Sequence, residues 1–505
     1  MRSLSSRRRL PRLHPLLLAL LAAQAAPAFA QVVVDGRIDP AEWQGAEHVT
    51  DFKVVEPLTG APSPYPTEAW ILATPEGLAI GFRNTQPANV PRTRTRTQRD
   101  QDGPVDRVNL MIDYDGDGRS GYNFTLNLTD GIIDATITNE RNFSKDWDAS
   151  WKHAVSEDGD TWSAEMLIPW YVAPMRKGVD GKRTVGIYLD RVIGSTGERV
   201  AWPDASFQRP RFLSDFRKLQ VAEYSQALLA STPYATVGYD NISGESHTDA
   251  GVDIFWKPNG QMQLTATLNP DFGQVESDNL VVNFGANETF FSDKRPFFTE
   301  NQGVFDVRTP DSGLLIYTRR IGGPRDDDSG AAAEIDAAVK LNGSAGGFDY
   351  GVLLASERDY ADNVGSAFYA QRLVHAADGL TLGYLGTWTD RPFLDRTAIV
   401  NAVDATWRPT PQWLLSAMVL ASDVDDPLDE GDGTGAWVRT FWNPSTAWQH
   451  ELEVTHFERS LDFNDMGFQR RASLNELEYT VTRRFSDFGA DDPRGSSSWA
   501  FEPQV

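Results

Sequence analysis

Long segments in which every second residue is apolar dominate the second half of the chain. The clearest lie at 261–268, 333–342, 380–388 and 448–455, and with their flanks such segments extend over about 9 to 11 residues. Strands of soluble sandwiches also alternate but average about 5 to 6 residues, whereas this length suits a tilted strand that crosses a membrane. Many of the segments end in aromatic residues, as the girdles of membrane barrels do. The pattern favours an antiparallel membrane β-barrel with a wet lumen between about residues 219 and 485.

In the first half of the chain the apolar residues follow a different pattern. Its apolar runs are short, as at 69–73, 78–82, 108–112 and 184–188, and Gly, Asp, Asn or Pro separates them at fairly even spacing. Short, evenly spaced strands with turn signals predict an all-β sandwich over 31–218. Buried aromatic residues dominate sandwich interiors, so we expect core positions for Trp70, Trp147, Trp151, Trp162 and Trp170.

The first thirty residues predict a secretory signal peptide. Five arginines precede the apolar run 16–23, and Ala28-Phe29-Ala30 supplies a small-residue cleavage site. No other segment approaches the roughly 20 apolar residues of a membrane helix. The chain has no cysteine and a net charge of -24, which argues against disulfides and against nucleic acid as a partner. We expect signal peptide 1–30, sandwich 31–218, barrel 219–485 and a flexible tail 486–505.

A phenylalanine-rich segment stands apart from both patterns. Six phenylalanines fall within 284–305, among acidic residues and the pair Lys294-Arg295. The segment is too irregular to face lipid and too aromatic to be left in water. It therefore predicts a plug-like element, 270–310, against the barrel interior, with its charges paired to charges of the lumen and with Phe290 and Phe297 both shielded from solvent.

These stretches together resemble a bacterial envelope family that joins a family 9 carbohydrate-binding-like domain to a C-terminal outer-membrane β-barrel of unassigned function. The resemblance rests on VVVDGRIDPAEWQGAE, LMIDYDGDGRSGYNFTLN, DWDASWKHAVSEDGDTWSAEMLIPW, AWPD and, in the second half, NPDFGQVESDNLVVNFGANETFFSDKRPFFTENQGVF. It implies an outer-membrane location, contact with outer-membrane lipid and with the barrel assembly machinery, and a sandwich that binds glycan or oligosaccharide ends and calcium. Relatives carry more barrel sequence than this chain, so closure of the barrel stays open.

Sugar-binding members of the family 9 modules hold a sugar between two aromatic rings. The first ring is missing here, because Gly103 and Pro104 stand at its place. The second falls within SFQRPRFLSDF, which offers phenylalanines only. The predicted carbohydrate-binding residues are Asp106, Asn109, Trp202, Phe207 and Phe212. The alternative is a sandwich kept as a structural module without a sugar site.

Asp113, Asp115 and Asp117 form the first half of a calcium-loop pattern, with hard oxygen ligands at alternate positions and a glycine for the turn. A helix–loop–helix calcium site needs a glutamate further on, where this chain has Phe124. The other interpretation is an Asp/Gly-rich hairpin turn between two strands. The sequence leaves both calcium and the turn as hypotheses.

No catalytic motif stands out. The sequence contains no nucleophile elbow, P-loop, zinc-protease helix or dinucleotide fingerprint, and its histidines lack metal-ligand spacing. Its 71 acidic residues neither nominate nor exclude a glycosidase pair. Three functions remain: an outer-membrane barrel for glycan binding, uptake or envelope organisation; a carbohydrate-active enzyme that hydrolyses O-glycosyl bonds; and a structural envelope protein without a ligand.

Overall fold

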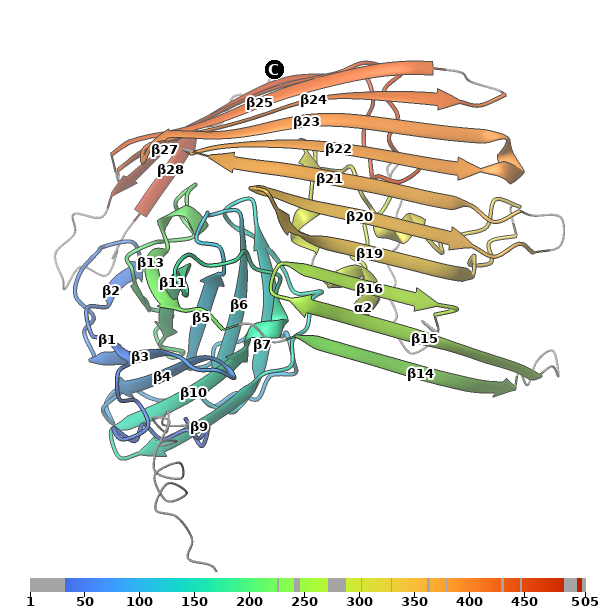
Figure 1. Ribbon diagram of the computed structural model, residues 1–505. Coiled ribbons are helices and arrows are strands. Elements are labelled where there is room, and N and C mark those ends of the chain that lie inside the picture. The colour runs from blue at the N-terminus through green and yellow to red at the C-terminus, as the bar shows by residue number, and fades with distance from the viewer. Residues whose placement is uncertain are drawn as a thin grey trace, which may run out of the picture.

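The computed structural model describes residues 32–224, 227–239, 246–270, 288–300, 302–327, 329–360, 364–377, 379–427, 431–445, 447–485 and 497–501. These residues form a two-sheet sandwich followed by one large, curved antiparallel sheet (Figure 1). The expected all-β fold class, a sandwich followed by an outer-membrane-type sheet, is confirmed. The expected signal peptide lies outside the described residues, as does the expected tail except for 497–501, which form a strand.

The sandwich consists of a five-stranded sheet packed on an eight-stranded sheet. The first has the order β1 (Glu47–Val49), β3 (Thr67–Ala73), β4 (Gly77–Thr85), β10 (Thr161–Pro169), β9 (Lys152–Asp158). The second has the order β2 (Lys53–Glu56), β12 (Arg199–Trp202), β11 (Lys182–Val192), β5 (Arg107–Asp113), β6 (Ser120–Asn127), β7 (Ile132–Thr138), β8 (Asn142–Ser144), and β13 (Arg217–Ala222) also pairs with β11. Short 3₁₀ turns are η1 (Trp170–Val172) and η2 (Leu213–Asp215).

Apolar side chains from both sheets meet in one core between them. Four of the five predicted core tryptophans are buried there: Trp147, Trp151, Trp162 and Trp170. Trp70 differs, because it is only partly buried and stacks on His48 with ring centroids 4.7 Å apart.

A buried carboxylate attaches the N-terminal segment to this sandwich. Glu165 on β10 accepts backbone N–H bonds from Asp35 at 3.0 Å and from Gly36 at 2.9 Å, and a bond from Trp43 Nε1 at 3.2 Å. Burial raises the pKa of Glu165 to about 7, because a charged carboxylate loses its hydration there.

The large sheet has thirteen strands, and every neighbouring pair is antiparallel. In order they are β14 (Leu228–Tyr239), β15 (Ser246–Asn259), β16 (Met262–Leu268), β19 (Ile335–Ala345), β20 (Phe348–Glu357), β21 (Ala367–Ala377), β22 (Leu380–Arg391), β23 (Arg396–Thr410), β24 (Trp413–Asp425), β25 (Gly431–Ser445), β26 (Trp448–Phe457), β27 (Leu474–Phe485) and β28 (Ser497–Phe501). Within the described ranges β14 and β28 are the edges of the sheet, so closure of a barrel stays a prediction.

The alternation in these strands is inside out compared with a soluble sheet. On β16 the polar residues Gln263, Thr265 and Thr267 are buried, while Leu268 is exposed. Exposed apolar residues recur along the outer face of β22 to β27, among them Trp388, Val403, Val419, Val438 and Leu452. Apolar residues outside and polar residues inside are the pattern of a sheet surrounded by lipid around a wet lumen.

The phenylalanine-rich segment lies on the concave side of this sheet (Figure 1). α2 (Pro296–Thr299) and η3 (Gln302–Val304) lie within it. The residues that follow form the two-stranded sheet of β17 (Arg308–Thr309) and β18 (Gly313–Leu314), and then η4 (Thr318–Arg320). Phe297, Phe298 and Phe305 pack in one cluster with residues of the sheet. Phe297 is buried as expected, whereas Phe290 is 45% exposed because it packs at the margin on Tyr317 and Phe468.

Asp293 and Arg295 pair within this segment, whereas pairing with charges of the sheet was expected. Asp293 and Arg295 form an ion pair with each other at 2.6 Å, and Arg295 also donates to the backbone carbonyls of Thr318 and Ile321. The sheet contributes Lys340 on β19, whose Nζ donates to the carbonyls of Phe297, at 2.6 Å, and Glu300. Asp293 and Arg295 pair with each other rather than with charges of the sheet because they are only two residues apart in the sequence.

The two ends of the large sheet differ in their connections. At the end that touches the sandwich, β15–β16, β19–β20, β21–β22, β23–β24 and β25–β26 are each joined by two residues, whereas β27 and β28 are eleven residues apart. At the other end the connections are longer and include η5 (Pro392–Leu394) and the loop 458–473. No helix among the described residues is long and apolar enough to cross a membrane.

Candidate functional site at the sandwich–barrel junction

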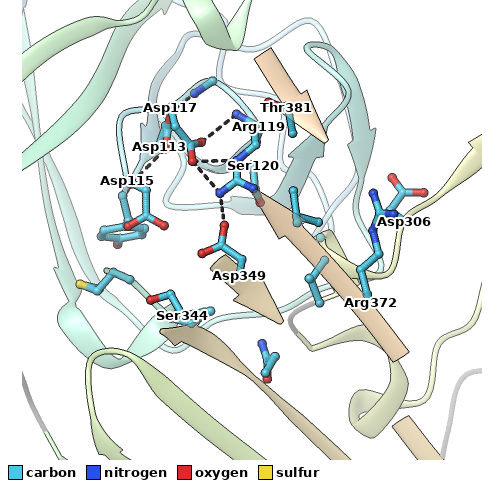
Figure 2. Close-up of a pocket in the computed structure, with 18 of the residues that line it drawn as sticks. Asp113, Asp115, Asp117, Arg119, Ser120, Asp306, Ser344, Asp349, Arg372 and Thr381 are labelled. Atoms are coloured by element: carbon cyan, nitrogen blue, oxygen red, sulfur yellow. Dashed lines mark hydrogen bonds and ion pairs between the residues drawn. The ribbon is translucent and has the colours of Figure 1, made fainter. Parts of the chain in front are cut away.

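A cavity of about 200 Å³ lies where the sandwich meets the inner face of the large sheet. The hairpin between β5 and β6 forms one wall, and β19 to β23 form the facing wall. Residues 303–306 of the plug segment complete the lining. Figure 2 shows the aspartates of the hairpin on one side, with Asp349 reaching toward them from the sheet. The cavity therefore joins the two halves of the chain.

Asp113 organises the hairpin. It ends β5, and its carboxylate accepts the backbone N–H groups of Asp115 at 3.1 Å, Gly116 at 2.9 Å and Gly118 at 2.7 Å. Gly118 has a φ of 73°, a conformation that favours glycine. Burial, with the nearby charge of Asp117 second, raises the pKa of Asp113. The carboxylate thus closes a tight turn, as the hairpin alternative predicts.

Protein donors also engage the other two predicted calcium ligands. Asp115 accepts the backbone N–H of Arg176 at 2.7 Å, and burial raises its pKa to about 6. Asp117 accepts Arg119 Nε at 2.7 Å and pairs with Arg176 at 3.0 Å. Calcium needs six to eight converging oxygens, whereas here two arginines take the place of the cation. This arrangement does not fit calcium. The calcium hypothesis can be tested by comparing the melting temperature of the protein in calcium and in chelator.

Asp349 connects the sandwich to the sheet. It lies near the start of β20 and accepts Arg176 Nε at 3.1 Å and Arg176 Nη2 at 2.6 Å, and it also pairs with Arg119. The same arginines contact Asp117, so two carboxylates and two guanidinium groups form one network (Figure 2). Charge-assisted hydrogen bonds of this kind are the strong ones. We call Asp117, Arg119, Arg176 and Asp349 the junction network.

Further bonds dock the sandwich on the same end of the sheet. Arg408 on β23 pairs with Glu140 of the sandwich at 2.8 Å. Lys257 on β15 donates to the carbonyls of Trp170 and Tyr171, each at 3.2 Å, and to a third carbonyl in the segment that follows. Sequence reasoning missed all of these partners, because no local pattern indicates which distant carboxylate or carbonyl a basic residue will meet.

The predicted sugar-binding residues occupy two environments. Asp106 and Asn109 are buried, and Asn109 donates to Asp190 and accepts from Thr125. Phe212 is also buried and in this conformation has no free ring face to offer a sugar. The other two predicted carbohydrate-binding residues are Trp202 and Phe207.

Those last two residues are partly exposed. Phe207 packs on Phe212 with centroids 4.3 Å apart and carries Arg199 over its ring at 4.8 Å. Trp202 packs against the core between the two sheets, whereas Phe207 packs against the cluster on the other face of the eight-stranded sheet. The structure therefore does not bring these two residues together on one face, and sugar binding stays a prediction.

One further group of carboxylates lies close together in the described ranges: the oxygens of Asp100, Asp134 and Asp148 are within 4.8 Å of one another. Arg99 occupies the centre of this group, because it pairs with Asp134 and contacts Asp148 at 2.5 Å and Asp100 at 3.6 Å. Trp151 Nε1 donates to Asp134 at 2.6 Å. An arginine therefore supplies the positive charge at this position.

The sequence of residues 227–342 matches a family described as a domain of unknown function, DUF5916. The matched residues run from the strand β14 into β19 and include the plug segment. They contain the phenylalanine-rich stretch on which the resemblance of the second half rests. No curated protein matches the chain.

Solved structures give weaker likenesses. A candidate carbohydrate-binding protein from Bacteroides uniformis is 14% identical, with a TM-score of 0.30, and the match covers 37% of this chain and 92% of that protein. A loop-deletion mutant of the outer membrane protein OmpT of Vibrio cholerae is 13% identical, with a TM-score of 0.23, covering 55% and 99%. Salmonella typhi OmpF in complex with daunomycin is 12% identical, with a TM-score of 0.25, covering 56% and 96%. Scores this low establish no common fold.

Proposed function

We propose that the protein is an outer-membrane β-barrel protein that takes up glycan-derived solutes, with its sandwich on the periplasmic side of the membrane. One observation carries the proposal: the sandwich is docked on the end of the sheet at which five strand pairs are joined by two-residue turns. Bacterial outer-membrane barrels have short periplasmic turns and longer extracellular loops. A solute that passes along the lumen would therefore reach the sandwich last.

The two faces of the sheet support the membrane part of the proposal. Its outer face exposes large apolar residues over β22 to β27, which would be costly in water as a patch of this extent. Its inner face carries buried polar residues such as Gln263, Asn342 and Thr455. The glycan part rests on the resemblance of the sandwich to family 9 carbohydrate-binding modules.

Single cysteines test the location and the orientation, since the chain has none of its own. Ser460 lies in the long loop 458–473 and Ser195 in a turn of the sandwich, and both are exposed. In intact cells a membrane-impermeant thiol reagent should label Ser460→Cys, and it should label Ser195→Cys only after the outer membrane is permeabilised. Labelling of Ser195→Cys in intact cells would refute the orientation.

Transport needs a separate measurement. Liposomes that contain the purified full-length protein should swell in neutral mono- and disaccharides faster than empty liposomes do. Equal swelling rates would refute uptake while leaving the membrane location intact.

A further inference from the structure

We propose that the junction cavity is a binding site for an uncharged, monosaccharide-sized polyol, on the path between the lumen and the sandwich. The proposal rests on the proposed function, because a sugar reaches this cavity only through the lumen or from the periplasm. It adds a binding site that includes neither Trp202 nor Phe207.

Three buried polar atoms that line the cavity have no hydrogen-bond partner among the described residues. They are the hydroxyl of Tyr114 from the sandwich hairpin, Oδ1 of Asn342 on β19 and Nε of Arg372 on β21. Their residues are 2%, 3% and 8% exposed. Buried polar groups in proteins are nearly always hydrogen-bonded. A hydroxyl-rich ligand both donates and accepts, so it can satisfy an amide oxygen, a phenol and a guanidinium N–H together.

The charges of the lining argue against an anionic ligand. Six aspartates and three arginines line the cavity, which leaves an excess of negative charge. Arg372 already forms a double ion pair with Asp404, and Arg408 pairs with Glu140. No arginine of the lining is therefore free to clamp a carboxylate or a phosphate. A cationic ligand is also disfavoured, because these aspartates have partners already. Asp117 and Asp349 pair with Arg119 and Arg176, Asp404 pairs with Arg372, and Asp306 pairs with Arg308. Asp113 and Asp115 accept backbone N–H groups.

The size of the cavity limits the ligand. Its volume of about 200 Å³ is below the roughly 300 to 1,000 Å³ of pockets for drug-sized ligands, and suits a single sugar ring. Tyr114, Tyr122 and Tyr350 are part of the lining and offer apolar ring surface beside the polar atoms. A small apolar surface with a few convergent polar groups is the usual composition of such sites.

Calorimetry on the full-length protein in detergent tests the site, with D-glucose, D-galactose and D-mannose as neutral probes and D-glucuronate and D-glucosamine as charged ones. At least one neutral hexose should bind, and neither charged sugar should bind more tightly. Tyr114→Phe removes one hydroxyl, and Asn342→Leu removes the amide at similar volume. Each should weaken binding about fivefold, the effect of one neutral hydrogen bond. Thr455→Val is the matched control, because the Thr455 hydroxyl is buried and unpartnered on β26 outside this cavity.

Three results would overturn the proposal: no binding of any neutral hexose, tighter binding of a charged sugar, or binding that neither Tyr114→Phe nor Asn342→Leu weakens beyond the control. The last result would place the sugar elsewhere. Equal melting temperatures of the variants would show that a loss of binding is not a loss of folding. If the liposomes swell but no hexose binds, the cavity site alone is overturned. If a neutral hexose binds as expected but Ser195→Cys is labelled in intact cells, the proposed function alone is overturned.

Discussion

Removing the charge of Asp349 should weaken the docking of the sandwich on the large sheet without changing the fold of either. Asp349→Asn keeps the volume of the side chain and one oxygen acceptor, but it takes away the carboxylate that Arg119 and Arg176 share. Asp349 is largely buried, with 17% of its side chain exposed, so solvent replaces little of the lost interaction.

The size of the effect follows from the network. Loss of one partner of a buried, hydrogen-bonded charge pair costs about 2 to 5 kcal/mol. The lower end applies here, because Asp117 still pairs with both arginines and the asparagine oxygen still accepts one bond. We expect a loss of about 2 kcal/mol, which is roughly a thirtyfold rise in the population of the undocked state.

Labelling of a buried thiol measures that population. Met175 is 2% exposed, lines the junction cavity, and its backbone N–H donates to the carbonyl of Gly260 on the barrel side at 2.8 Å. In a Met175→Cys background, a polyethylene-glycol maleimide that is too large for the cavity should reach the thiol only when the sandwich lifts. When closing is faster than labelling, the labelling rate is proportional to the population of the open state. Asp349→Asn should therefore raise the labelling rate about thirtyfold.

Two controls make this result decisive. Asp311→Asn removes a carboxylate that contacts Arg470 at 3.4 Å and Arg471 at 3.5 Å rather than the sandwich, and it should leave the rate unchanged. Arg176→Gln combined with Asp349→Asn should have less effect than the sum of the two, because both break one interaction. A rise below threefold, or one equal to that of Asp311→Asn, would refute the view that the junction network holds the sandwich.

Two further predictions concern the sandwich. The melting temperature of the sandwich should be equal in calcium and in chelator, because backbone amides and arginines already engage the hairpin carboxylates. If calcium instead raises the melting temperature, and Asp115→Ala abolishes that increase, the metal site would be established. The raised pKa of Glu165 means that the folded state holds a proton more tightly than the unfolded state, so its contribution is complete below about pH 4.5 and is lost as pH rises through about 7. Glu165→Gln should remove up to about 3 kcal/mol of that pH dependence between pH 4 and 8, as urea unfolding at each pH would measure; identical pH profiles would contradict the assignment.

The sequence predicted what local rules control. Strand length and alternation identified a sandwich and a large antiparallel sheet, because side chains of a strand alternate between its two faces whatever it packs against. Bulky aromatic residues in short strands predicted core positions, and Trp147, Trp151, Trp162 and Trp170 occupy them. The Asp/Gly hairpin was one of two alternatives, since the same residue types serve a tight turn and a calcium loop.

Only the tertiary structure decided what lies between the two halves. Arg119 and Asp349 are 230 positions apart, and an ion pair over that separation depends on how two finished sheets dock. The same holds for the cavity that Tyr114 and Asn342 share, since neither the β5–β6 hairpin nor β19 alone encloses it. Periodicity states which residues share a face, but it does not say which face turns toward the lumen or which distant charge a guanidinium meets. Those depend on contacts that form only when the whole chain has folded.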